Sequence, residues 1–188
     1  MAHHTHATMD ENYTSAQAHR YDRTAGLARG MYRRIAQDAG GALPAGSRIV
    51  DIGTGPGRLV AAIASLRPDV RVIGVDPAPA MAARAELRLA RFDHAEVRVA
   101  TAEELPFDGA QVDLVVSSFA LHHWRDPRQG GAEIRRVLAP TGSVRIYDMA
   151  FADFAGLQAG LRPSSHPVPV DRFALTPLGF PAIHRLSL

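Results

Sequence analysis

Short apolar segments alternate with helical segments of about ten residues through the middle of this chain. Each apolar segment has the length of a buried strand, whereas the segments between them repeat their apolar residues at helical spacing. This alternation predicts βαβ units and a parallel sheet. The predicted strands are 48–52, 70–75, 97–100, 113–116, 143–147 and 182–186, and the predicted helices are 14–39, 58–66, 78–90, 132–138 and a short one over 170–175.

A length of 188 residues fits one domain, and we expect a Rossmann-like, doubly wound α/β fold with a mostly parallel sheet. Three segments are predicted along the chain. Residues 1–12 form a disordered tail, residues 13–41 a helical lid, and residues 42–188 the domain that carries the sheet. Glycines at 40 and 41, followed by Pro44, mark the boundary between the lid and this domain.

The stretch VDIGTGPGRL, residues 50–59, places three glycines between the first predicted strand and its helix. Such a turn lets the backbone of an open α/β sheet approach a ligand closely. A dinucleotide-binding fingerprint needs a third glycine where this chain has Arg58, so that fingerprint is not met. Asp51 would also repel a pyrophosphate by a few kcal/mol at intermediate dielectric. It favours a ligand that carries an ammonium and a sulfonium group, such as S-adenosylmethionine.

Asp76 ends the second predicted strand, in VIGVDPAPAM. An acidic side chain at this point of the architecture takes ribose hydroxyls. The alternative is that Asp76 only caps the helix that begins at Pro77. Its position after a strand, downstream of the glycine loop, favours the ribose interpretation.

Four segments follow one another in the order VDIGTGPGRLV, VIGVDPAPAM, VATAEELPFDGAQVDLVVSSFALHHW and EIRRVLAPTGSVRIYDM. Together they resemble the class I S-adenosylmethionine-dependent methyltransferases over about residues 48–148. Within that family the chain is most similar to the small-molecule group that includes ubiquinone/menaquinone C-methyltransferases. The resemblance implies methyl transfer to an oxygen, carbon or nitrogen atom of a small molecule, with S-adenosylhomocysteine as product. It makes 42–188 the S-adenosylmethionine-binding domain.

The resemblance also implies how the cofactor is held. Asp51 and the backbone of Gly53 and Gly55 would hold its amino-acid part, and Asp76 would take the ribose hydroxyls. The Ala102 N–H would face an adenine ring nitrogen. The complete implied set is Tyr21, which would close over the cofactor, Asp51, Gly53, Thr54, Gly55, Asp76, Pro77, Thr101, Ala102, Glu103 and Ser117, which would border the methionine tail.

The chain departs from the family pattern at two points. Thr101 stands where the group usually has an aspartate that accepts a hydrogen bond from the adenine amine, and a neutral acceptor makes roughly half as strong a bond. In addition, the family's sheet has two more strands after the fifth, whereas only the segment 182–186 is predicted as a strand here. The sequence therefore predicts a shortened C-terminal edge, and a homodimer that covers it is a candidate arrangement.

Methyl transfer from a sulfonium is an in-line displacement, and holding the reactants together supplies roughly 7–11 kcal/mol of the barrier. A general base adds about 10²–10⁴-fold, so the reaction does not depend on an evident base. His122 and His123, in FALHHW, are the candidate catalytic residues, and His122 is preferred because the resemblance places it near the pocket. It either takes a proton from the acceptor or has a packing role beside an acceptor that is already nucleophilic. The local sequence offers His122 no carboxylate partner, which favours the second alternative.

The composition of the chain bears on metal sites, cellular location and nucleic-acid binding. The chain has no cysteine, which excludes cysteine-ligated metal sites, and no metal is assigned. No apolar run reaches the roughly 18 residues of a membrane span, and the start lacks a signal-peptide core, so we expect a cytoplasmic protein. All 21 basic residues are arginines, but they are scattered, which argues against a nucleic-acid partner.

Two other functions remain open at this point. The first is an S-adenosylmethionine-binding protein without transfer activity, acting as a regulatory or partner subunit. The second is a nucleotide-dependent oxidoreductase, which Asp51 opposes.

Overall fold

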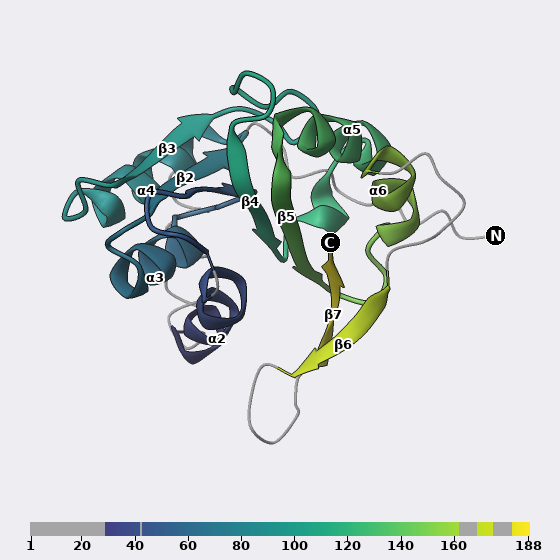
Figure 1. Cartoon of the computed structure of the whole chain (residues 1–188), viewed down its shortest axis with the longest axis horizontal. Coiled ribbons are helices and arrows are strands. Elements are labelled where there is room, and N and C mark those ends of the chain that lie inside the picture. The colour runs from purple at the N-terminus through teal and green to yellow at the C-terminus, as the bar shows by residue number, and fades with distance from the viewer. Residues whose placement is uncertain (1–28, 42, 162–168, 175–181) are drawn as a thin grey trace.

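The computed structural model describes residues 29–41, 43–161, 169–174 and 182–188. The strands in this part of the chain form one seven-stranded sheet in the order β3-β2-β1-β4-β5-β7-β6 (Figure 1). Strands β1 to β5 run parallel to one another, and β7 runs antiparallel between β5 and β6. The strands are β1 Arg48–Ile52, β2 Arg71–Asp76, β3 Ala95–Val99, β4 Val112–Ser118, β5 Leu138–Asp148, β6 Val170–Ala174 and β7 Ala182–Ser187.

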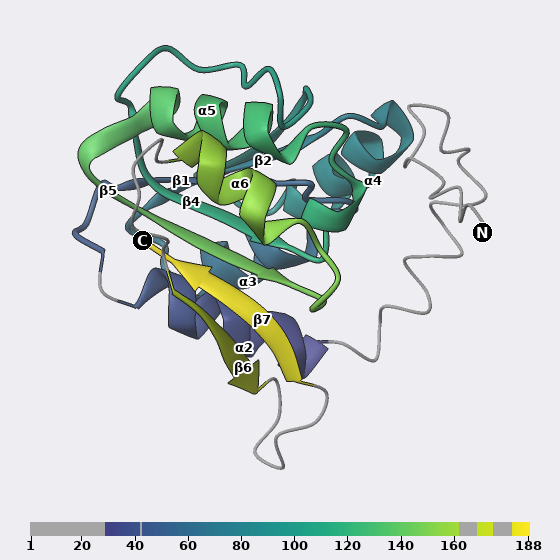
Figure 2. The same ribbon diagram turned by 90° about the vertical axis from the view of Figure 1, so that its right-hand side faces the viewer.

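Helices cover both faces of this sheet (Figure 2). They are α2 Arg29–Gly40, α3 Arg58–Leu66, α4 Pro79–Leu89, α5 Pro127–Val137 and α6 Phe154–Leu161, with a 3-10 turn η2 at Leu121–His123. Helices α2, α3 and α4 share one apolar cluster with the sheet, and α5 and α6 share the other. None of the helices in the described ranges has the length and apolarity needed to cross a membrane.

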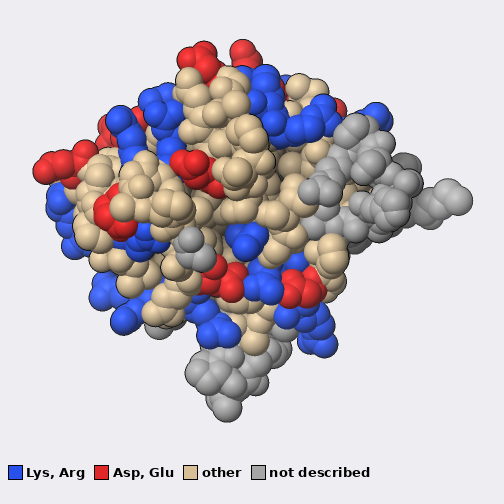
Figure 3. Space-filling view, viewed as in Figure 1, with Lys and Arg blue, Asp and Glu red and all other residues tan. Residues whose placement is uncertain are grey.

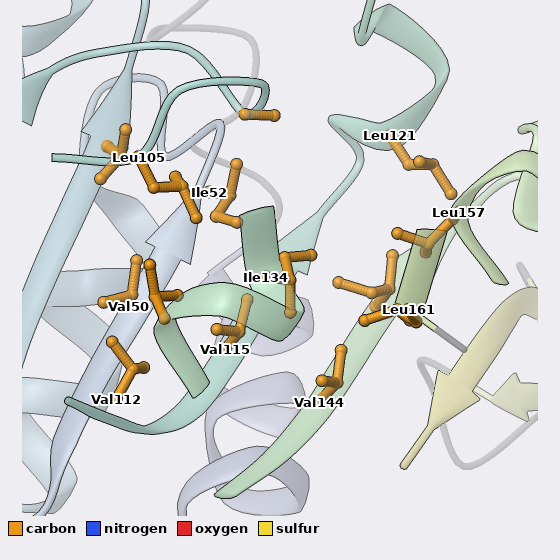
Figure 4. Packing of buried hydrophobic residues seen from close by; sticks show 14 of the residues in the cluster. Val50, Ile52, Leu105, Val112, Val115, Leu121, Ile134, Val144, Leu157 and Leu161 are labelled. Carbon is orange, nitrogen blue, oxygen red and sulfur yellow. The ribbon is translucent and has the colours of Figure 1, made fainter. Parts of the chain in front are cut away.

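Alternation along the strands divides the core between these two layers. Ile49 of β1 packs in the cluster of α2, α3 and α4, whereas Val50 packs in the cluster of α5 and α6, because successive strand residues point to opposite faces. Figure 4 shows the second cluster, in which side chains of β1, β4 and β5 meet those of α5 and α6. The predicted Rossmann-like, doubly wound α/β fold is confirmed.

The C-terminal edge of the sheet is complete, so the predicted shortening is wrong. Residues 170–174, predicted as a short helix, form the edge strand β6. This strand pairs antiparallel with β7, and its Phe173 ring packs edge-on against Tyr147 of β5 at 5.2 Å. Arg185 of β7 also binds Asp171 of β6 at 2.5 Å. Because β7 is paired on both sides, the argument for a homodimer that covers an unpaired β7 does not hold.

Helix α2 is anchored to the sheet. It buries Ile35, Ala36 and Ala39 against the helical layer. Its Asp38 accepts a hydrogen bond from the Tyr147 hydroxyl at 2.5 Å. The same carboxylate forms an ion pair with Arg185 at 2.9 Å. The predicted helix 14–39 is observed from residue 29 onward, as α2. Its first half lies outside the described residues. The tail predicted for residues 1–12 and the part of the predicted lid 13–41 before residue 29 lie there as well, and both segments stay predictions.

Candidate functional site

A pocket opens at the carboxyl ends of β1, β2, β3 and β4. Its wall consists of residues 52–56, 76–78, 100–103, 118–120 and 123–125, with Tyr32 of α2 and Met81 of α4. The strand order reverses between β1 and β4, and open α/β sheets bind their ligands at this point. The pocket is therefore the candidate binding site.

The glycine loop 53–57 joins β1 to α3. Its three glycines, Gly53, Gly55 and Gly57, have φ angles of 71°, 54° and 75°, a region that other residues adopt only with strain. Gly53 N donates to Val75 O of β2 at 2.8 Å. A Cβ at Gly53 would lie 2.2 Å from the Cβ of Ala120. Glycine is thus required here both for the turn and for the close approach to the segment after β4.

Asp51 lies just behind the pocket wall and is 1% exposed. Burial raises the pKa of Asp51 to about 7; the Thr54 hydroxyl opposes this shift and the nearby Asp76 carboxylate adds to it. Within the described part of the chain, neither Asp51 carboxylate oxygen makes a hydrogen bond of standard geometry, and neither does Oγ1 of Thr54 in the pocket wall; the nearby Thr54 hydroxyl is still close enough to favour the Asp51 carboxylate. Buried polar groups are normally paired, so these atoms are available to a cationic or hydrogen-bonding ligand group.

Asp76 ends β2 and lines the pocket together with Pro77. Its carboxylate accepts the backbone N–H of Gly55 at 2.7 Å and that of Ala78 at 3.0 Å. Burial raises the pKa of Asp76, and these two N–H groups oppose that shift. Asp76 therefore braces the glycine loop and the start of α4. A carboxylate has about four acceptor sites, which leaves acceptor capacity for ligand hydroxyls.

The segment 101–103 follows β3 and lines the pocket opposite the glycine loop. Thr101 makes an isolated bridge with Glu104, and the Glu103 carboxylate accepts the backbone N–H of Asp126 at 3.0 Å. This contact links the segment to the start of α5. Thr101, Ala102 and Glu103 are thus brought together with the glycine loop in one pocket, as the cofactor prediction requires.

Two predicted cofactor residues stand apart from this arrangement. The Ser117 side chain is fully buried and donates to Ile52 O at 2.7 Å. The adjacent Ser118 lines the pocket instead, because neighbouring strand residues point to opposite faces. Tyr21 lies outside the described residues. Among the described residues, Tyr32 of α2 lines the pocket.

His122 lies in the turn η2 after β4, beside the pocket wall. Its Nδ1 is 2.7 Å from Oδ1 of Asp148 at the end of β5. The local sequence contained no such carboxylate, so tertiary structure supplies the partner. The neighbouring His123 lines the pocket, and burial together with His122 lowers its pKa.

Sequence reasoning missed several residues of the site. Phe119 has a positive φ of 56° directly after β4 and lines the pocket, and a phenylalanine gives no sequence signal of such a conformation. Trp124 lines the pocket with a buried indole N–H that has no hydrogen-bond partner among the described residues. Asp148 carried a usable signal, since a carboxylate at the carboxyl end of a central parallel strand lies at the ligand-binding edge.

Comparison with known proteins identifies the family to which the chain belongs. Residues 50–146 match the family described as a methyltransferase domain. The chain is 35% identical over 151 residues to a malonyl-[acyl-carrier protein] O-methyltransferase of Geobacter sulfurreducens, covering 79% of this chain and 56% of that protein. It is also 35% identical over 133 residues to a demethylmenaquinone methyltransferase of Clavibacter sepedonicus, covering 69% and 54%. The chain thus spans about half the length of the curated relatives it matches.

A solved structure agrees with this assignment. Phosphoethanolamine N-methyltransferase 2 of Haemonchus contortus, in complex with S-adenosyl-L-methionine, superposes with a TM-score of 0.66 at 27% identity. The match covers 72% of this chain and 33% of that one.

Proposed function

The chain belongs to the class I S-adenosylmethionine-dependent methyltransferases, and from this premise we propose that it transfers a methyl group from S-adenosylmethionine to a small-molecule acceptor. The observation that carries the proposal is Asp51, a buried carboxylate just before the glycine loop that makes no hydrogen bond of standard geometry to the described residues and has only the Thr54 hydroxyl near it to offset its burial. An ammonium group is favoured there, whereas the pyrophosphate of NAD would be repelled.

The residues of the pocket fit this cofactor. Asp51, Thr54 and the backbone of the glycine loop would hold the amino-acid part. Asp76 would accept from the ribose hydroxyls while it keeps its bonds to the loop. Residues 101–103 would line the adenine. When bound, S-adenosylmethionine supplies an electrophilic methyl group on a sulfonium centre. The protein's own contribution is to orient the two reactants and to exclude water from between them.

Calorimetry with S-adenosylmethionine, S-adenosylhomocysteine and NAD tests the cofactor directly. We expect both adenosyl ligands to bind and NAD to bind more weakly than either. Tighter binding of NAD would overturn the proposal. A turnover assay with labelled methyl donor and a metabolite extract then separates a transferase from a binding protein without transfer activity, which would bind the cofactor and label nothing.

Cofactor affinity is expected to rise about eightfold between pH 6 and pH 7.5. Asp51 has a pKa of about 7 in the ligand-free protein, so its ionised fraction grows by roughly that factor over this range. The free energy of unfolding changes with pH in the opposite direction to the cofactor affinity. A raised carboxyl pKa means that the folded state holds the proton more tightly, so Asp51 lowers the free energy of unfolding as pH rises from about 4 to 7.

The variant Asp51→Asn should remove this pH dependence and weaken binding by about 1–3 kcal/mol at pH 7.5. Asp93→Asn changes an exposed carboxyl outside the pocket and is the matched control. Calorimetry across four pH values measures both variants. An unchanged pH profile in Asp51→Asn would show that another group binds the ammonium.

Replacing Thr101 with aspartate is expected to tighten cofactor binding by up to about 1 kcal/mol, because an ionised acceptor makes a stronger bond to the adenine amine. Thr101→Asn is the matched control, since it offers a neutral acceptor of similar size and should leave the affinity near its starting value. Equal or weaker affinity in Thr101→Asp would mean that the adenine amine does not reach this side chain.

The acceptor is proposed as a small molecule for two reasons. The named relatives act on different acceptors, among them a demethylmenaquinone and a malonyl group on a carrier protein. On the face seen in Figure 3, arginines alternate with acidic residues and form no continuous basic surface of the kind that nucleic acid requires. A cytoplasmic location and a homodimer stay predictions, and light scattering at tens of micromolar protein measures the second.

A further inference from the structure

Strand β3 is the outermost strand at one end of the sheet, and β6 is the outermost strand at the other end (Figure 1). Among the described strands, β3 pairs with β2 alone, and this pairing keeps a single register from Ala95 to Val99. Proteins protect most edge strands with a bulge, a proline or a covering segment. The pairing of β3 contains no bulge and its sequence no proline, so its free side is a surface to which another strand can be added.

The free side of β3 presents the backbone groups of Val97 and Val99. Val72 N of β2 donates to His94 O at 3.0 Å, which begins a ladder in which the even-numbered residues 94–100 bond to β2. Because backbone groups alternate between the two sides of a strand, the N–H and C=O groups of Val97 and Val99 point away from β2. Within the described ranges no other segment bonds to them. The Val99 residue is also 56% exposed.

The side chains of β3 divide into a charged face and an apolar face. On the charged face, the Glu96 carboxylate binds Arg98 at 2.7 Å and Arg71 of β2 at 2.9 Å. All three of these side chains are partly exposed. On the other face, Ala95 and Val97 pack against the apolar cluster that includes α4. A strand that joined β3 would therefore meet one acidic and one basic side chain on one face and small apolar side chains on the other.

We propose that β3 is a dimer interface, at which a second copy of this chain adds its own β3 antiparallel, with the two-fold axis at Val97. In this register Glu96 lies directly opposite Arg98 of the partner subunit, and Arg98 lies opposite the partner's Glu96. Each Val97 exchanges both backbone hydrogen bonds with the partner's Val97, and the Val99 N–H donates to Ala95 of the partner subunit. The charged pairs fall between these bonded pairs, at the positions where opposing side chains come closest.

The charge pattern selects this register. A slip by two residues keeps the backbone bonds, but it places Glu96 opposite the partner's Glu96, or Arg98 opposite the partner's Arg98. Like charges directly opposite each other destabilise a strand pair, whereas opposite charges stabilise it. A slip by one residue puts the outward backbone groups out of step with those of the partner. Two-fold pairing also uses the same edge of both copies, so the assembly closes at two chains.

The proposed dimer leaves both cofactor pockets open. Each pocket lies at the carboxyl ends of its strands, and none of residues 95–99 lines it. In an antiparallel pair the carboxyl ends of the two β3 strands point in opposite directions, so the two pockets lie at opposite ends of the joined strands. A strand pair is a small interface, and we therefore expect a dissociation constant on the order of 10 μM. Cofactor affinity should not depend on dimerisation.

Sedimentation velocity of the full chain, from about 1 to about 200 μM protein, measures the association. We expect the mass to rise from one chain to two and no further, because pairing uses the β3 edge of both copies. A monomer over the whole range, or a mass that keeps rising beyond two chains, would overturn the proposal.

Charge reversal tests the register. Arg98→Glu should weaken the dimer about tenfold or more, because glutamates would then oppose each other across the strand pair. Glu96→Arg should do the same, because arginines would oppose each other. An equal mixture of the two variants restores opposite charges across the pair and should associate about as tightly as the unaltered protein.

The matched control is Arg128→Glu, which reverses an exposed charge on α5 and should leave the dimer unchanged. Melting temperatures confirm that the variants are folded. Tight association of Arg98→Glu by itself, or no association in the mixture of folded variants, would contradict the proposed register.

Hydrogen exchange of the unaltered protein locates the interface without any substitution. Between low and high protein concentration, the N–H groups of Val97 and Val99 should exchange about threefold or more slowly. The amides of β6, at the other end of the sheet, are the internal control, and their rates should stay the same. Slower exchange at β6 in place of β3 would show that the copies meet at the other edge and would overturn the proposal.

Discussion

Replacing Gly53 with alanine is expected to weaken S-adenosylmethionine binding by about 100-fold or more. Two costs combine at this position. The φ angle of 71° strains any residue with a side chain by roughly 1–2 kcal/mol. The new Cβ would also lie 2.2 Å from the Cβ of Ala120, which forces the loop and the segment after β4 apart. Both segments line the pocket, so the separation changes the site itself. Calorimetry with S-adenosylhomocysteine measures the loss.

Gly46→Ala is the matched control, because Gly46 has a φ of 82° but no heavy atom near its missing side chain and does not line the pocket. It should lower the free energy of unfolding by about 1–2 kcal/mol and leave the cofactor affinity unchanged. The double variant Gly53→Ala with Ala120→Gly removes the clash and keeps the strain, so it should recover part of the affinity. Equal affinities in the single variant and the unaltered protein would contradict the close approach.

Replacing Gly160 with alanine should lower the free energy of unfolding by about 3 kcal/mol. Helices α5 and α6 cross in backbone contact, and a Cβ at Gly160 would lie 2.0 Å from Arg128 O and 2.8 Å from Ala132 N. The opposing Gly131 is equally confined, at 2.3 Å from Leu157 O. Alanine favours a helix by about 1 kcal/mol over glycine, but backbone atoms at these distances must move, so the clash outweighs that gain.

Thermal unfolding measures this prediction, and a loss of 3 kcal/mol corresponds to roughly 6–12 °C for a chain of this size. The matched control is Gly30→Ala on α2, where a Cβ meets no heavy atom of the described residues within 4 Å. It should be neutral or slightly stabilising. Similar melting temperatures for the two variants would mean that α5 and α6 separate without loss. Affinity for S-adenosylhomocysteine should be unchanged in folded Gly160→Ala, since residue 160 does not line the pocket.

Secondary structure was predicted best where the residues of one continuous segment are enough to define it. The strand 48–52, the glycine loop and the helix 58–66 are observed as predicted, because apolar spacing and three glycines define that unit without distant contacts. The pocket residues Gly53, Asp76 and Thr101 could likewise be identified in advance. Each follows a strand of the parallel sheet, and such strands bring their carboxyl ends to one edge.

The C-terminal strand β6 could not be predicted in this way. Residues 170–174 have no alternating apolar pattern, and of the five only Phe173 is buried. Their conformation follows from pairing with β7 and from the contact of Phe173 with Tyr147. An edge strand of this kind takes its geometry from partners that are distant in sequence.

Sequence alone determined the doubly wound architecture and the glycine loop, and it predicts the preference of Asp51 for a cationic ligand, because these depend on periodicity, on residues that tolerate positive φ and on the sign of a charge. Only the tertiary structure decided that Asp148 pairs with His122, that Ser118 and not Ser117 faces the pocket, and that Gly131 and Gly160 let two helices touch. Each of these depends on distances between segments far apart in the chain, which a one-dimensional pattern does not contain.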